Sequence, residues 1–188
     1  EEERLEGERI PVSQVAPERR APPERVAEAA PLGPPRALTD WTQPNAVASR
    51  APGHLEGPSG LARAWRTDIG AGSSDDAWLT GAPIVADGLL YALDSAARVT
   101  ALDAGSGETV WTVSVAPEGE DGEEGFGGGL AWLDGRVFVG TGFGEVVALG
   151  ARDGEVLWRR DLAAPIRAAP AAEDGRVVVA TRDSSGFA

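Results

Sequence analysis

Residues Gly81 to Val115 read GAPIVADGLLYALDSAARVTALDAGSGETVWTVSV, and residues Gly128 to Leu162 read GGLAWLDGRVFVGTGFGEVVALGARDGEVLWRRDL. The two stretches align without a gap, and matching positions lie 47 residues apart, so that Trp111 falls on Trp158. Self-similarity at a fixed period of this size is typical of folds in which one supersecondary unit is repeated and stacked.

Two partial copies flank the full ones. A third copy begins at Ala169 and reads APAAEDGRVVVATRDS, with its Asp-Gly pair 40 residues after that of the second copy. An earlier fragment, Ala64 to Ile69, matches the end of a unit and places Trp65 46 residues before Trp111. The longer first spacing is explained by an acidic, glycine-rich insertion at Ala116 to Gly127.

Each full unit divides into four pieces that are too short for helices and rich in Val, Leu, Thr and aromatic residues, a composition typical of strands. In the first unit the predicted strands are Ala82–Ala86, Leu89–Asp94, Val99–Asp103 and Thr109–Val115. Asp-Gly between the first and second strands predicts a type I′ hairpin, and we expect the same turn where Ser-Gly or Asp-Gly precedes the fourth strand. The predicted hairpin-turn residues are Asp87, Gly88, Asp134, Gly135, Asp174, Gly175, Gly107 and Gly154.

No segment reads as a helix that would cover the faces of these antiparallel sheets, so the sheets must cover one another. Stacked four-stranded units of 40 to 50 residues are the blades of a propeller. The predicted fold class is therefore all-β, a β-propeller of four-stranded antiparallel blades. Indole rings on the outermost strands would pack between neighbouring blades, which assigns a structural role to Trp65, Trp111 and Trp158.

Composition excludes several chemistries. The chain has 188 residues, no Cys, and 17 basic residues that are all Arg against 30 acidic ones, for a net charge of −13. Without Cys there is no disulfide framework, thiolate metal site or cysteine nucleophile. Without Lys there is no phosphate-binding loop that ends in Gly-Lys-Ser/Thr. The negative charge disfavours nucleic acid as a partner.

The first 60 residues differ from the rest and hold ten of the 14 prolines. Few large apolar residues occur there, so residues 1–60 are predicted as a disordered tether, followed by a partial propeller over residues 61–188. Within the tether, Ile10-Pro11-Val12 and Trp41-Thr42-Gln43-Pro44 are the segments expected to dock on a folded body. The chain has no initiator Met, and we expect it to be a processed or partial product.

Other candidate sites have stronger structural explanations. His54 is the only histidine and falls in the predicted tether, which disfavours a catalytic triad. Gly140, Gly142 and Gly144 are read as hairpin glycines, since Glu145 breaks the dinucleotide-binding pattern. Two further groups stay open: a calcium site in the insertion, and residues before the first full unit that line one mouth of the ring. Their members are Glu118, Glu120, Asp121, Glu123 and Glu124 for the first group and Asp75, Asp76 and Trp78 for the second.

The stretch Ala101 to Trp111, ALDAGSGETVW, resembles the repeat of pyrroloquinoline-quinone-type propellers, Ala-x-Asp-x-x-Thr-Gly-Lys-x-x-Trp. Ser106 stands for the usual Thr and Glu108 for the usual Lys. The resemblance implies a ring of eight blades in which an N-terminal strand closes the last blade. In this chain it implies a closing strand at 63–69, blade one at 81–115, blade two at 128–162 and the start of blade three at 169–188.

Within these propellers the sequence is similar to the periplasmic lipoproteins that form the B component of the outer-membrane β-barrel assembly machinery. The similarity rests on the Pro-rich lead, on Leu5 to Val12, on Trp41 to Pro44, and on the passage from Ala64 into the first blade. It implies a non-catalytic scaffold without cofactor at the periplasmic face of the outer membrane. It also implies two kinds of partner, the barrel-folding subunit and unfolded outer-membrane proteins, and a lipidated Cys that this sequence lacks.

Two alternatives remain from the same repeat. One is a pyrroloquinoline-quinone-dependent dehydrogenase, in which such blades surround the quinone and a calcium ion and a vicinal Cys pair stacks on the cofactor. The other is a different propeller binding or sensor module. No binding residue is carried over from either family.

Overall fold

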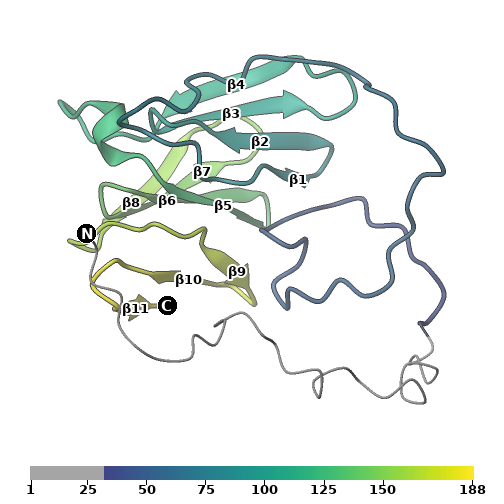
Figure 1. Ribbon diagram of the computed structural model, residues 1–188. Coiled ribbons are helices and arrows are strands. Elements are labelled where there is room, and N and C mark those ends of the chain that lie inside the picture. Colours follow the sequence, from purple (N-terminus) through teal and green to yellow (C-terminus); the bar gives the residue numbers. More distant parts are fainter. Residues whose placement is uncertain (1–31) are drawn as a thin grey trace, which may run out of the picture. The chain divides into compact units, whose positions relative to one another are not determined.

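The computed structural model describes residues 32–188, and its regular secondary structure is almost entirely β (Figure 1). Successive strands pair as antiparallel neighbours in two four-stranded sheets, β1 to β4 and β5 to β8, and one three-stranded sheet, β9 to β11. The strands are β1 Ile84–Ala86, β2 Leu89–Leu93, β3 Arg98–Asp103, β4 Thr109–Ser114, β5 Gly128–Leu133, β6 Arg136–Thr141, β7 Glu145–Gly150, β8 Val156–Asp161, β9 Ala171–Glu173, β10 Arg176–Ala180 and β11 Gly186–Phe187. These bounds confirm the predicted class of four-stranded antiparallel blades.

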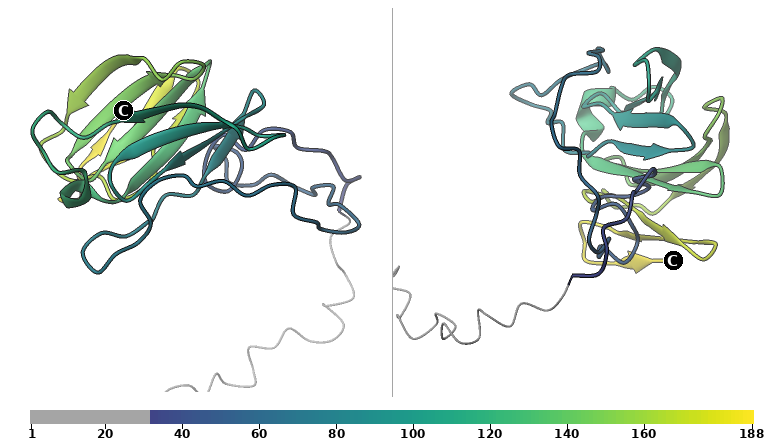
Figure 2. Two further views of the ribbon diagram at one scale, coloured as in Figure 1. Left: turned by 90° about the horizontal axis from the view of Figure 1, so that it is seen from above. Right: turned by 90° about the vertical axis from the view of Figure 1, so that its right-hand side faces the viewer.

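The sheets are layered in the order of the chain (Figures 1 and 2). The largest apolar core lies between the first two sheets and includes the fully buried side chains of Tyr91, Val99, Leu130 and Val147. A smaller cluster that includes Phe138 and Ala172 joins the second sheet to the third. Burial of these sheet faces against each other is the main source of stability, since no helix covers them among the described residues.

The turn between the first two strands of each sheet has one geometry. Asp87 and Gly88 have φ values of 50° and 76°, and the corresponding values at Asp134 and Gly135 are 49° and 75°. Asp174 and Gly175 repeat them at 49° and 73°. Positive φ at both central residues defines the type I′ turn, whose twist matches that of the flanking strands.

The turn before the fourth strand is not of type I′, and this prediction was wrong. Only Gly107 in the first sheet and Gly154 in the second have positive φ, 76° and 73°, while the residues before them do not. The reason is local: the Asp103 carboxylate accepts hydrogen bonds from the backbone N–H groups of Ser106 (2.8 Å) and Gly105 (3.0 Å) and shapes a longer turn. The Ser106 N–H, as the main cause, lowers the pKa of Asp103.

The indole rings of Trp65 and Trp111 pack on these glycine turns. Trp111 Nε1 donates to the carbonyl oxygen of Ala151 (3.0 Å), and its ring lies against Gly154, where an added Cβ would be 2.7 Å from Cε3. Trp65 Nε1 donates to Ala104 O (3.0 Å) and its ring covers Gly107 in the same way. The acceptors and glycines of the two contacts lie 47 residues apart, so the contact follows the repeat.

Residues 63–69, predicted as a closing strand, belong to no strand in the structure. The backbone of this segment pairs with no other described segment, and it is held instead through side chains. Besides the Trp65 indole, Thr67 Oγ1 donates to Gly107 O (2.7 Å). A strand requires a ladder partner, whereas the tryptophan contact requires only the turn of the neighbouring blade.

The predicted tether differs from the structure in its second half. Residues 1–31, including Ile10-Pro11-Val12, lie outside the described residues, but residues 35–188 form one compact unit. We name residues 36–56 the strap, which Figure 1 shows in purple beside β1 and β5. Trp41 of the strap forms a β-bridge with Val85 of β1, so the predicted boundary at residue 60 lies too late in the chain. The expected docking of Trp41-Thr42-Gln43-Pro44 does occur.

Candidate functional site

The first strand of each sheet runs from the long loops that enter the blade to the Asp-Gly hairpin at its other end (Figure 1). This direction defines two rims. The loop rim carries the segments before β1, β5 and β9 and the turns between second and third strands. The hairpin rim carries the Asp-Gly turns and the glycine turns on which Trp65 and Trp111 pack. Binding residues of a rigid sheet scaffold are most often found in such loops.

Three side chains from the loop rim form a continuous stack, which we name the aromatic ladder: Trp78, Phe126 and Arg167. The Trp78 and Phe126 ring centroids are 6.0 Å apart at an interplanar angle of 56°. The Arg167 guanidinium carbon lies 4.7 Å from the centroid of the Phe126 ring, within cation–π range, and Nη1 donates to Phe126 O. Each member precedes the first strand of a different blade.

Large apolar side chains are unusually exposed at the ladder and next to it. Trp78 is 58% exposed and the adjacent Leu79 is 40% exposed, although Ala77 beside them is fully buried. Tryptophan and arginine are the residues most enriched where proteins bind other proteins. The sequence indicated Trp78 as a mouth residue, but Phe126 and Arg167 were missed because they stand in loops that do not follow the repeat.

The acidic insertion is packed on the loop rim. A Cβ added at Gly125 would collide with the Phe143 ring, and one added at Gly122 would collide with Ala96 O, so both glycines permit close approach. Gly142 N also donates to Gly125 O (3.1 Å). Within the loop Gly122–Gly125 forms a short 3-10 helix, η2, and Asp121 Oδ1 caps it by accepting from Glu123 N (3.1 Å).

The acidic side chains of the insertion are exposed to solvent. The exposed carboxylates of the rim are Asp75, Asp76, Glu118, Glu120, Asp121, Glu123 and Glu124. Within residues 32–188, no group of three or more His, Cys, Asp or Glu is placed to hold a metal ion. The loop rim thus combines two aromatic rings, the Arg167 guanidinium and several exposed carboxylates.

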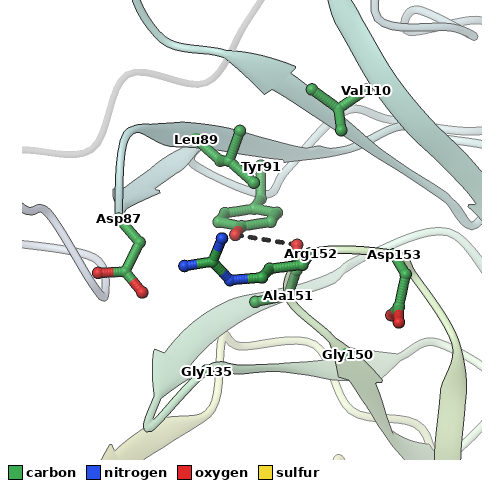
Figure 3. A pocket seen from close by; sticks show the side chains of 9 residues that line it. All are labelled: Asp87, Leu89, Tyr91, Val110, Gly135, Gly150, Ala151, Arg152 and Asp153. Atoms are coloured by element: carbon green, nitrogen blue, oxygen red, sulfur yellow. Dashed lines mark hydrogen bonds between the residues drawn. The ribbon is translucent and has the colours of Figure 1, made fainter.

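A pocket of about 400 Å³ lies at the opposite rim, between the first two blades (Figure 3). Its lining residues are Asp87, Leu89, Tyr91, Val110, Gly135, Gly150, Ala151, Arg152 and Asp153. Tyr91 is buried and its hydroxyl donates to Ala151 O (3.1 Å), the carbonyl that also accepts from Trp111. Burial, as the main cause, raises the pKa of Tyr91 from 10.0 to about 12. The hydroxyl thus joins two blades and is held protonated.

Tyr91 is the only tyrosine, which makes its titration directly measurable. We expect its phenolate absorbance to appear near pH 12 in the folded chain and near pH 10 after unfolding in urea. Because the folded pKa is the higher one, the stabilisation is complete below pH 10 and is lost as pH rises from 10 through 12. Tyr91→Phe should remove this part of the pH dependence. A folded-state titration with a midpoint at pH 10 would contradict the buried, hydrogen-bonded phenol.

The remaining sequence candidates occupy structural positions. His54 lies in the strap, where its carbonyl oxygen accepts from Arg36 N (3.1 Å). Gly140 lies near the end of β6 and Gly144 precedes β7 with φ of 92°, so these glycines belong to the hairpin between the two strands. No helix among the described residues is long and apolar enough to cross a membrane.

The turn between the second and third strands of the first two sheets carries a shared feature that sequence comparison missed. Asp94 is buried and its Oδ1 accepts from Ala96 N (2.9 Å) and Arg98 N (2.8 Å), which closes the turn between β2 and β3. At the same repeat position Thr141 Oγ1 accepts from Glu145 N (3.2 Å). The change from Asp to Thr preserves the capping oxygen and hides the correspondence.

Comparison with known proteins places the repeat in a family. The family model described as outer membrane protein assembly factor BamB matches residues 59–121 and 95–188. The chain is 35% identical over 103 residues to the outer membrane protein assembly factor BamB of Escherichia coli K12, covering 53% of this chain and 26% of that protein. It therefore spans about a quarter of the length of this relative.

Quinone enzymes share the repeat. The chain is 27% identical over 134 residues to the dehydrogenase subunit of a quinone alcohol dehydrogenase from Gluconacetobacter polyoxogenes, covering 63% of this chain and 18% of the enzyme. The solved quinohemoprotein alcohol dehydrogenase of Pseudomonas putida HK5 superposes with a TM-score of 0.60 at 25% identity, over 77% of this chain and 23% of that one. Because the family model covers more than half of the chain, this protein belongs to the outer membrane protein assembly factor BamB family of β-propellers with pyrroloquinoline-quinone-like repeats.

Proposed function

We propose that this chain is part of a non-catalytic scaffold subunit of the outer-membrane β-barrel assembly machinery at the periplasmic face of the outer membrane. Its partners are the barrel-folding subunit and unfolded outer-membrane proteins. The observation that carries the proposal is the exposed aromatic ladder on the loop rim of a chain of this family. A rigid propeller that presents Trp78 and Arg167 to solvent offers anchors for another protein.

The chemistry of the ladder defines the surface it fits. Phe126 already engages the Arg167 guanidinium, which leaves Trp78 and Leu79 as the free apolar anchors. The exposed carboxylates of the same rim favour a partner surface that carries basic side chains beside an apolar patch. Long-range attraction of this kind speeds association and weakens as salt screens it.

Truncation of the ladder tests the proposal. We expect Trp78→Ala to weaken binding to the soluble periplasmic domains of the barrel-folding subunit about 30-fold, the effect of losing about 2 kcal/mol at a hot spot. The measurement is titration calorimetry with the complete parent protein. Trp158→Ala is the matched control, because Trp158 is also exposed (41%) but lies on the outer strand β8. Equal affinities of the two variants would contradict the ladder as the docking surface.

The second candidate function is a pyrroloquinoline-quinone-dependent alcohol dehydrogenase, which the 27% identity to the quinone enzyme favours. The described residues fit this cofactor poorly: no group of three or more His, Cys, Asp or Glu among them is placed to hold calcium, and the strap pairs with the first-strand edges. We therefore assign no residue to quinone or calcium. One experiment distinguishes the two functions: the complete parent protein is mixed with quinone and calcium, and cofactor absorbance and alcohol oxidation are measured. Turnover of alcohol would overturn the scaffold proposal.

A further inference from the structure

The strap contacts the first strand of successive sheets, one residue for each sheet. Trp41 pairs with Val85 of β1 through two backbone hydrogen bonds, from Trp41 N to Val85 O (2.6 Å) and from Val85 N to Trp41 O (2.8 Å). Thr42 O accepts from Trp132 N of β5 (2.8 Å). Val85 and Trp132 lie 47 residues apart and occupy the same place in the repeat.

The third contact uses a side chain. Gln43 is 5% exposed, its Oε1 accepts from Ala172 N of β9 (3.2 Å), and its Nε2 donates to Ala172 O (2.5 Å). Ala172 follows Trp132 by 40 residues and is again the same repeat position. A carboxamide carries one acceptor and donors in a peptide-like plane, so Gln43 pairs with the strand edge as a backbone peptide would. Three consecutive residues of the strap, Trp41 to Gln43, therefore form hydrogen bonds with the first strands of three adjacent sheets.

The strap also holds its own shape through hydrogen bonds between its residues. At its base Arg36 N donates to His54 O (3.1 Å) and Glu56 N donates to Arg36 O (2.8 Å). At its tip Ala46 N donates to Gln43 O (3.0 Å), and Ala46 is fully buried. A loop with a fixed base and a fixed tip presents its contact residues with little loss of chain entropy on docking.

We propose that the first-strand edges of adjacent blades form a binding site for an extended peptide, one residue to a blade, and that the strap fills this site in cis. The ligand is an extended peptide segment. Its backbone forms hydrogen bonds with the first strands of the first two blades, and a carboxamide side chain forms them with the first strand of the third. Strand edges with unpaired N–H and C=O groups are templates for added strands. While the strap is in place, a foreign segment cannot pair with the edge positions Val85, Trp132 and Ala172. The site shares no residue with the aromatic ladder.

Binding in trans tests the site. The probe is a fluorescent synthetic peptide of residues 36–56, titrated by anisotropy into a chain that begins at Gly57 and into the complete chain. We expect saturable binding to the shortened chain and at least tenfold weaker binding to the complete chain, whose site is occupied. Gln43→Glu in the peptide should weaken binding at least tenfold, because a carboxylate has no N–H to donate to Ala172 O. Asn45→Asp makes the same chemical change at an exposed neighbour and should leave binding unchanged.

Two results would overturn the site: equal binding to both chains, or no binding to a shortened chain that retains its β circular dichroism. If the shortened chain does not fold, amide hydrogen exchange of the complete chain tests the proposal instead. The amides of Val85, Trp132 and Ala172 should then exchange at least tenfold faster in Gln43→Glu than in Asn45→Asp. Unchanged protection of all three would show that the strap does not hold the strand edges.

Discussion

Replacing Gly154 by alanine is expected to lower the free energy of unfolding by about 3 kcal/mol. Two costs add at this position. Its φ of 73° is unfavourable for any residue with a Cβ, and the new Cβ would lie 2.7 Å from Cε3 and 2.9 Å from Cδ2 of Trp111. The ring must move, and the hydrogen bond from its Nε1 to Ala151 O is then lost or lengthened. Urea unfolding followed by circular dichroism measures the change.

Gly135 separates the two costs. Its φ is 75°, almost that of Gly154, but no atom lies within 4 Å of an added Cβ. Gly135→Ala should therefore carry the backbone cost alone, about 1 kcal/mol. The difference between the two variants measures the contact between the blades. If both substitutions cost the same, the indole does not constrain the Gly154 turn and the tryptophan contact is not a source of stability.

The repeated sheets could be predicted from the sequence because short local patterns specify them. Asp-Gly needs only two adjacent residues with positive φ to set a hairpin, and the tryptophan spacing registers one blade on the next. The turn at Gly107 was misassigned for a local reason as well, since the Asp103 carboxylate competes for the backbone N–H groups that the dipeptide rule leaves out. The local sequence pattern therefore predicted the sheets correctly, but not the turn before the fourth strand, the closing strand at 63–69 or the boundary at residue 60.

The candidate sites were less accessible to sequence reasoning. Gln43 meets Ala172 across 129 residues, and its Pro-rich surroundings carry no strand periodicity, so that only the neighbouring Trp41 marked the segment. The aromatic ladder gathers one side chain from each of three loops of different lengths. Such loops are free to vary because the sheets alone fix the blade, and no spacing rule links Trp78 to Arg167.

Trp111→Ala should be the most destabilising substitution of an outer-strand residue, with an expected loss of about 3 kcal/mol in the free energy of unfolding. The ring packs against the Gly154 turn and the Tyr91 ring, with centroids 5.9 Å apart in the latter case, and its Nε1 satisfies Ala151 O. Removing it opens a void between two blades and leaves Tyr91 as the remaining side-chain donor to that carbonyl. Thermal and urea unfolding of the complete chain measure the loss.

Trp158→Ala supplies the comparison, because it makes the same change at the same repeat position. The Trp158 ring has the corresponding neighbour on its own sheet, Phe138, at a centroid distance of 5.9 Å, but it is 41% exposed and covers no glycine turn among the described residues. Its loss should cost about 1 kcal/mol, since a partly solvated ring gives up less burial. The sign of the difference is decisive: were Trp158→Ala as damaging as Trp111→Ala, packing within each sheet would hold the propeller together, and the inter-blade contact of Trp111 with the Gly154 turn would lose its assigned role.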